Sequence, residues 1–193
     1  MCCLTRRVNS LRLSFGAAWG SLRIAKEVCA MAKVYTGVGS RETPVAILNV
    51  MTQLARKLES EGWLLRTGNA SGADAAFRKG VLDMMHREVY TASEARNHLS
   101  ARVRECMESD FYELHPAPQR CSEQAKLLLM RNGLELMGVL YNKPSRFVVC
   151  WTPNAAEVGG TGQTLRLARK YGVQVFNLAN EEHLQRILAY ISR

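Results

Sequence analysis

The stretch that decides the fold, residues 146–177, reads RFVVCWTPNAAEVGGTGQTLRLARKYGVQVFN. It begins with an unbroken apolar run, 147–151, which predicts a strand buried on both faces. A glycine-rich turn then opens a helix that ends near Gly172, and residues 173–176 predict the next strand. Strand, turn, helix and strand make a parallel βαβ unit. Its turn lies at the carboxyl end of the first strand, where open α/β sheets bind ligands.

Two similar turns occur upstream, each between a predicted strand and a predicted helix. GVGSR, at 37–41, follows a short strand at 34–36, and TGNASGAD, at 67–74, follows a strand at 63–66. Three such turns on one edge of a sheet would line a pocket with backbone N–H groups and helix N-termini, which together hold phosphate.

The other elements follow from apolar spacing. Thr43 is predicted to cap a helix that has Pro44 at its first position and ends at Gly62. The stretch HPAP at 115–118 must be irregular, because each proline disfavours helix in the residue before it, and such an insertion often belongs to a site. The remaining predictions are helices at 75–85, 92–107, 122–139 and 181–191 and a strand at 88–90. Together they indicate an α/β fold: a single Rossmann-like three-layer domain with a mostly parallel sheet flanked by helices.

Charge and composition favour one domain with an appended tail. The chain has 193 residues, 47% of them hydrophobic, which suits one substantial core. Residues 1–30 carry five basic side chains and one acidic, so they supply nearly half of the formal charge of +9. Met31 directly precedes the first strand. We therefore interpret residues 1–31 as a basic extension outside the fold and 32–193 as the domain, although an organellar presequence or weak secretory signal is an alternative.

Cysteine usage and hydropathy restrict the environment. The six cysteines form no CxxC pair, so neither a metal site nor a disulfide is predicted. No apolar run approaches the ~18 residues that a membrane span requires. A reducing cytoplasm, with no membrane partner, fits best.

The turn GVGSR is not a standard dinucleotide fingerprint. Glu42 stands where the third glycine of GxGxxG would be, and no GK[ST] follows to make a P-loop. It offers instead close backbone approach, a hydroxyl and a guanidinium that can bind phosphate bidentately, unless it is only a tight turn with a solvated arginine. Its candidate ligand residues are Gly37, Gly39, Ser40 and Arg41.

The turn TGNASGAD combines small residues with a carboxylate at the mouth of a helix. Asp74 either sits there because the helix dipole favours it, or accepts a ribose hydroxyl or positions a water. It is the one weak catalytic candidate. The binding candidates of this turn are Thr67, Gly68, Ser71, Gly72 and Asp74.

The third turn is the most specific, because a bare turn needs one glycine and not three. Thr152 should lie near any ligand, since it ends the preceding strand. Arg131 and Asn132 interrupt an apolar helix pattern and either face solvent or reach the pocket. Among the histidines, His115 is the candidate for a role in the site, because it lies beside Pro116 in the irregular insertion, and a structural turn is the alternative. The candidates of the third turn are Gly159, Gly160, Thr161, Gly162 and Gln163, followed by Thr164.

Taken together, YTGVGSRETP at 35–44, RTGNASGAD at 66–74, and CWTP at 150–153 with GGTGQT at 159–164 resemble a phage- and prophage-encoded branch of the SLOG superfamily. That superfamily of Rossmann-like domains includes the DNA-processing protein A (DprA/Smf) family and the LOG-type phosphoribohydrolases. The resemblance covers roughly residues 33–178. It implies a nucleotide-like ligand and suggests a homodimer.

The two relatives imply different functions. Arg131-Asn132 and GQTLRLA at 162–168 resemble DprA segments, which implies single-stranded DNA binding, although Asn69 replaces a usual glycine. GGTG at 159–162 resembles the PGGxGTxxE motif that hydrolyses an N-glycosidic bond, but Val158 replaces its proline, Gln163 its threonine and Arg166 its catalytic glutamate. An arginine cannot replace a carboxylate that stabilises an oxocarbenium-like centre.

We therefore expect a domain that binds a nucleotide or nucleotide derivative through its phosphates, in phage DNA metabolism or phage–host conflict. Single-stranded DNA binding in recombination and N-glycosidic hydrolysis of a nucleotide are the alternatives. The residues do not decide whether the protein is an enzyme, and no cofactor is implied beyond a nucleotide-type ligand.

Overall fold

Five parallel strands form the centre of the computed structural model, which describes residues 33–93 and 99–193. The strands are β1 (Val34–Gly37), β2 (Leu64–Gly68), β3 (Arg87–Tyr90), β4 (Phe147–Cys150) and β5 (Gln174–Asn177). Their order is β3-β2-β1-β4-β5, and every neighbouring pair is parallel. The chain therefore reverses direction across the sheet between β1 and β4. Ligands of open α/β sheets bind at such a switch point.

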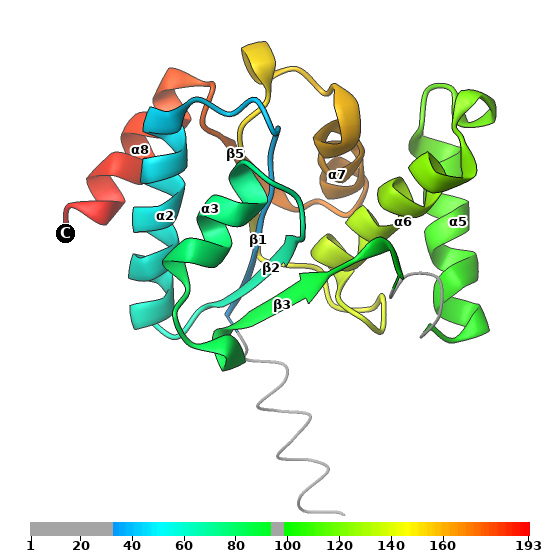
Figure 1. The fold of residues 1–193 in the computed structure, drawn as a ribbon, viewed down its shortest axis with the longest axis horizontal. Coiled ribbons are helices and arrows are strands. Elements are labelled where there is room, and N and C mark those ends of the chain that lie inside the picture. Colours follow the sequence, from blue (N-terminus) through cyan, green and yellow to red (C-terminus); the bar gives the residue numbers. More distant parts are fainter. Residues whose placement is uncertain (1–32, 94–98) are drawn as a thin grey trace, which may run out of the picture. The chain divides into compact units, whose positions relative to one another are not determined.

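Six helices of the described residues flank this sheet, so the predicted Rossmann-like α/β fold is confirmed (Figure 1). One face carries α2 (Val45–Ser60), α3 (Ala73–Gly80) and α8 (Glu181–Ile191), and the other carries α5 (Ala101–Leu114), α6 (Glu123–Met137) and α7 (Gly159–Lys170). Residues 33–193 form one compact unit. None of the helices in the described ranges is long and apolar enough to cross a membrane.

Alternation along the central strands creates the two cores. In β4, Val148 and Cys150 belong to the core under α5, α6 and α7, whereas Val149 belongs to the core under α2, α3 and α8. All three are fully buried. The apolar run predicted to be buried on both faces is therefore the middle of the sheet, as a parallel strand between two helical layers requires.

Three predicted helix boundaries were wrong. Thr43 does not cap α2, because its hydroxyl donates to Ser40 O at 2.7 Å instead. Helix α3 ends at Gly80 and not near residue 85, and Gly80 packs so closely on α2 that a Cβ there would meet the backbone of Thr52. Helix α5 begins after the N-cap Ser100 and continues to Leu114, beyond the predicted 92–107, of which 94–98 lie outside the described residues.

Gly37, predicted as a phosphate ligand, has a structural role at the end of β1. A Cβ at this position would lie 2.6 Å from Cγ of the buried Phe77 ring. We expect Gly37→Ala to lower the free energy of unfolding by about 1–3 kcal/mol, because overpacking forces the ring or the strand to move. Urea denaturation measures this. Gly160→Ala is the control, since its Cβ would meet nothing nearer than 3.8 Å, and equal stabilities of the two variants would contradict the prediction.

Candidate functional site

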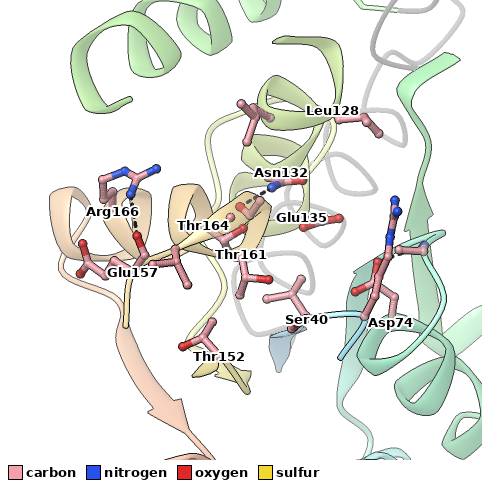
Figure 2. A pocket seen from close by; sticks show the side chains of 18 of the residues that line it. Ser40, Asp74, Leu128, Asn132, Glu135, Thr152, Glu157, Thr161, Thr164 and Arg166 are labelled. Atoms are coloured by element: carbon pink, nitrogen blue, oxygen red, sulfur yellow. Dashed lines mark hydrogen bonds between the residues drawn. The ribbon is translucent and has the colours of Figure 1, made fainter. Parts of the chain in front are cut away.

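A pocket of about 890 Å³ opens at the carboxyl edge of the sheet, at the switch point between β1 and β4 (Figure 2). Its walls are the turn after β1, the loop after β4, the first turn of α7 and one side of α6. Figure 2 shows Thr161 and Thr164 on the α7 wall and Asp74 on the opposite wall, with Glu135 drawn between them. The fold thus brings segments that are more than a hundred residues apart in the sequence to one hollow.

The glycine turns meet because their glycines permit close contact. A Cβ at Gly39 would lie 2.6 Å from Cβ of Ala73, at the start of α3, and 3.2 Å from the backbone of Trp151. A Cβ at Gly72 would lie 2.8 Å from Cα of Arg41. Gly72 also has a φ of 76°, which favours glycine. These contacts join the first turn to the second and to the end of β4.

The first turn offers fewer amides to a ligand than its sequence suggests. The amides of Val38 and Ser40 donate to the carbonyls of Val149 and Trp151, each at 3.1 Å, and so extend the pairing of β1 with β4. Among the described residues, the amides of Gly39 and Arg41 have no hydrogen-bond partner. The Arg41 side chain is exposed at the rim of the pocket.

The second turn is held by its own side chains. The Ala70 amide donates to the Asp74 carboxylate at 3.1 Å, and the Arg78 guanidinium donates to the carbonyls of Gly68 and Ala70. The Thr67 hydroxyl is fully buried and donates to Gly37 O at 2.6 Å. Only Ala70 and Asp74 of this turn line the pocket.

The third turn presents the N-terminus of α7 to the pocket. No side chain caps this helix at Val158, and the first internal bond runs from the Gly162 amide to Val158 O. The amides of Gly159, Gly160 and Thr161 consequently have no partner in the part of the chain that the structure describes. The Asn132 side chain donates to Gly160 O at 2.8 Å and so fixes α6 against this turn.

Two threonine hydroxyls lie beside the α7 N-terminus. The Thr164 hydroxyl lines the pocket, its residue is only 1% exposed, and it has no hydrogen-bond partner among residues 33–93 and 99–193. The Thr152 hydroxyl accepts from Asn177 Nδ2 at 2.7 Å, which leaves its own proton to donate. Leaving a buried hydroxyl unpaired is costly, so Thr164 is an unused hydrogen-bond donor at the edge of the pocket.

Arg166 also lines the pocket, and the predicted ligands Gly162 and Gln163 serve to hold it. The Arg166 guanidinium donates to Gln163 Oε1 at 3.0 Å and to Glu157 O at 3.1 Å. Burial lowers the pKa of Arg166. A Cβ at Gly162 would lie 2.6 Å from the Glu157 carbonyl, so glycine allows this loop to approach the helix.

The floor of the pocket carries a buried charged cluster, which we call the carboxyl cluster: Asp74, Arg131 and Glu135. Arg131 Nη1 contacts Glu135 Oε1 and lies 3.9 Å from Asp74 Oδ2. A Cβ on Gly68 would collide with all three side chains. Gly68, predicted to hold phosphate, instead makes room for this cluster.

Two carboxyl groups share one guanidinium in this cluster, and the pKa values of both carboxyls are raised. Burial raises the pKa of Glu135 to about 8, and the Asp74 charge adds to the effect while Arg131 opposes it. Burial also raises the pKa of Asp74, again against the attraction of Arg131. Carboxyls with raised pKa values in a cleft are a common feature of functional sites.

The insertion between β3 and β4 supplies an apolar wall. Residues of α6 and of the preceding loop form it: His115, Pro116, Ala125, Leu128 and Leu129. The His115 ring stacks on Phe111, with centroids 5.4 Å apart. Cys121 Sγ lies 3.8 Å from both ring nitrogens of His115.

The structure gathers some of the predicted ligand residues and separates others. Ten of them line the pocket: Gly39, Ser40, Arg41, Asp74, Arg131, Asn132, Thr152, Gly159, Gly160 and Thr161. The others do not line it: Gly37, Thr67, Gly68, Ser71, Gly72, Gly162 and Gln163. Sequence reasoning missed Glu135, whose signal was its position four residues after Arg131, on the same side of a helix.

Comparisons of the chain with protein-family models, with curated proteins and with solved structures give no match. Among residues 33–93 and 99–193, no group of three or more His, Cys, Asp or Glu side chains could hold a metal ion. The chemistry of the pocket is therefore argued from its geometry.

Proposed function

We propose that the pocket binds a nucleotide or nucleotide derivative, with a phosphate at the N-terminus of α7. The observation that carries the proposal is the buried Thr164 hydroxyl beside the amides of Gly159, Gly160 and Thr161 at the start of α7, all without a hydrogen-bond partner among the described residues. A phosphate oxygen accepts from hydroxyls and amides, and the helix dipole favours its charge. The resemblance of the three turns to SLOG proteins points to the same ligand class, and to a role in phage DNA metabolism or phage–host conflict.

The rest of the pocket suits the other parts of a nucleotide. Arg41 and Arg166 line it and supply positive charge near the phosphate. The wall of Pro116, Leu128 and Leu129 offers apolar surface against which a flat base can pack. A volume of about 890 Å³ is large enough for a nucleotide.

Thr164→Val separates this function from a structural role. The change keeps the shape and removes the unpaired hydroxyl, so we expect phosphate affinity to fall about 5–10-fold while stability stays equal or rises by ~1 kcal/mol. Calorimetry with inorganic phosphate and AMP, together with urea denaturation, measures both quantities.

Thr52→Val is the matched control, because the Thr52 hydroxyl is paired to Leu48 O and Ala76 O and lies outside the pocket. It should lose stability and keep affinity. Unchanged phosphate affinity in Thr164→Val would refute the phosphate site. If the affinity falls as expected, calorimetry with a panel of nucleotides, ADP-ribose derivatives and NAD identifies the ligand class. A salt-sensitive mobility shift of oligonucleotides, without nucleotide binding, would favour the DprA-like alternative.

A second candidate function is N-glycosidic hydrolysis, which the carboxyl cluster favours. Arg166 occupies the position of the glutamate in the LOG motif, but Asp74 and Glu135 supply two buried carboxyls in the same pocket. One carboxyl would protonate the leaving base while the other takes the proton of the attacking water. Chromatography that detects free base released from AMP by wild type, and no release by Asp74→Asn, would support hydrolysis. The absence of release by wild type at high protein concentration would exclude hydrolysis of AMP.

A further inference from the structure

The carboxyl cluster on the pocket floor is not suited to phosphate. With Asp74 ionised, the cluster carries no net positive charge whether Glu135 is protonated or ionised, so it does not attract an anion. The cluster nevertheless has unused hydrogen-bonding capacity. Within the described part of the chain, Arg131 Nε has no hydrogen-bond partner, although the residue is only 8% exposed and lines the pocket with Asp74 and Glu135.

Two neighbouring hydroxyl groups of a ligand could use the hydrogen-bonding capacity of the carboxyl cluster. Each hydroxyl can donate to a carboxylate and accept from a guanidinium N–H or a protonated carboxyl. We propose that Asp74, Arg131 and Glu135 form a subsite for a vicinal diol, so that the ligand is a ribose phosphate or ribonucleotide and not its 2-deoxy counterpart. This proposal rests on the proposed function, since it places the sugar of the same ligand.

The position of the cluster relative to α7 supports a sugar next to the phosphate. Arg131, Asn132 and Glu135 lie within five residues of one helix, and the Asn132 side chain bonds Gly160 in the first turn of α7. The floor and the phosphate end are thus held at a fixed separation by one hydrogen bond between α6 and α7. Figure 2 draws Glu135 between the α7 wall and Asp74.

The protonation of the cluster also fits a neutral partner. Because burial raises the pKa of Glu135 to about 8, its carboxyl keeps a proton at neutral pH and can donate to a ligand oxygen. Asp74, nearer the turn, accepts from the Ala70 amide and can accept a second hydrogen bond from a sugar hydroxyl. The floor therefore offers a donor and an acceptor to adjacent hydroxyls.

Calorimetry of the full chain at pH 7 with ribose 5-phosphate, 2-deoxyribose 5-phosphate and inorganic phosphate tests the proposal. We expect ribose 5-phosphate to bind about 10-fold more tightly than the deoxy sugar, because hydrogen bonds to charged groups are lost with the hydroxyl. Equal affinity of the two sugar phosphates overturns the diol subsite and leaves the phosphate site standing. Absence of binding by all three probes overturns the proposed function and the subsite together.

Two variants test whether the carboxyl cluster causes the preference for ribose 5-phosphate over 2-deoxyribose 5-phosphate. Asp74→Asn keeps an acceptor for the Ala70 amide and should reduce the ratio of the two sugar affinities to about 1–3, with inorganic phosphate binding unchanged. Glu135→Gln keeps a donor and should retain the preference for ribose at pH 7 and extend it to pH 9, where wild type loses it. Glu123→Gln, an exposed carboxylate of the same helix, is the control. A ratio unaffected by Asp74→Asn overturns the assignment.

Discussion

Arg131→Met is expected to lower the free energy of unfolding by roughly 3–5 kcal/mol at pH 7, the largest effect among the changes considered. The guanidinium lies between two buried carboxyls, Asp74 and Glu135, and its removal leaves the Asp74 charge unpaired in the interior and takes a hydrogen-bond donor from Glu135. The loss should shrink at pH 5, because Asp74, whose pKa is raised by burial, can then bind a proton and become neutral. Urea denaturation at the two pH values measures it.

A rescue variant and a control make this result specific. Adding Asp74→Asn and Glu135→Gln to Arg131→Met should recover most of the lost stability, since no buried charge then remains. Arg102→Met, an exposed arginine of α5, should change stability by less than about 0.5 kcal/mol. A loss in Arg131→Met that is equal at pH 5 and pH 7 would show that packing of the side chain, and not charge, causes it.

Glu135→Gln should flatten the dependence of stability on pH. Glu135 has an ordinary pKa of 4.5 and a folded-state pKa raised to about 8 by burial. Below pH 4.5 both states hold the proton, so stability is unaffected. Between pH 4.5 and pH 8 the unfolded chain releases this proton while the folded protein keeps it, so wild-type stability falls as pH rises, by an amount on the order of 5 kcal/mol in total.

The glutamine variant has no proton to lose at this position, so we expect it to be more stable than wild type at pH 8 by a few kcal/mol and similar to it near pH 4.5. Urea denaturation between pH 4.5 and pH 9 gives both curves. Asp74, whose pKa burial also raises, should leave a residual slope of the same sign. Parallel curves for the two proteins would mean that Glu135 is ionised in the folded state near neutral pH.

The local sequence pattern was sufficient to predict a helix or strand wherever that element depends mainly on its own residues. The helix predicted at 181–191 is α8, because its apolar positions recur at helical spacing and Asn180 caps its first turn. Helix α3 ended earlier than predicted, at a glycine whose close contact with α2 no local pattern contains. The other two boundary errors are local, because the Thr43 hydroxyl bonds Ser40 O and Ser100 caps α5.

The candidate site shows the same division. The meeting of the three turns could be predicted, since parallel strands place their carboxyl ends at one edge of a sheet. The directions of the amides could not, because Val38 and Ser40 donate to β4, a strand more than a hundred residues away. Thr67, Gly68 and Gln163 looked like ligands by residue type, yet they support the turn, the carboxyl cluster and Arg166.

The sequence by itself determined the α/β class, the parallel strands and the edge at which the glycine turns gather, because hydrophobic periodicity and glycine placement act over a few neighbouring residues. Only the tertiary structure decided which groups face the pocket. Glu135 becomes a proton-holding acid, and Thr164 an unpaired donor, through burial by helices that pack from distant parts of the chain. The burial of a side chain and its hydrogen-bond partners are properties of the assembled fold, so they cannot be predicted from a local stretch of sequence.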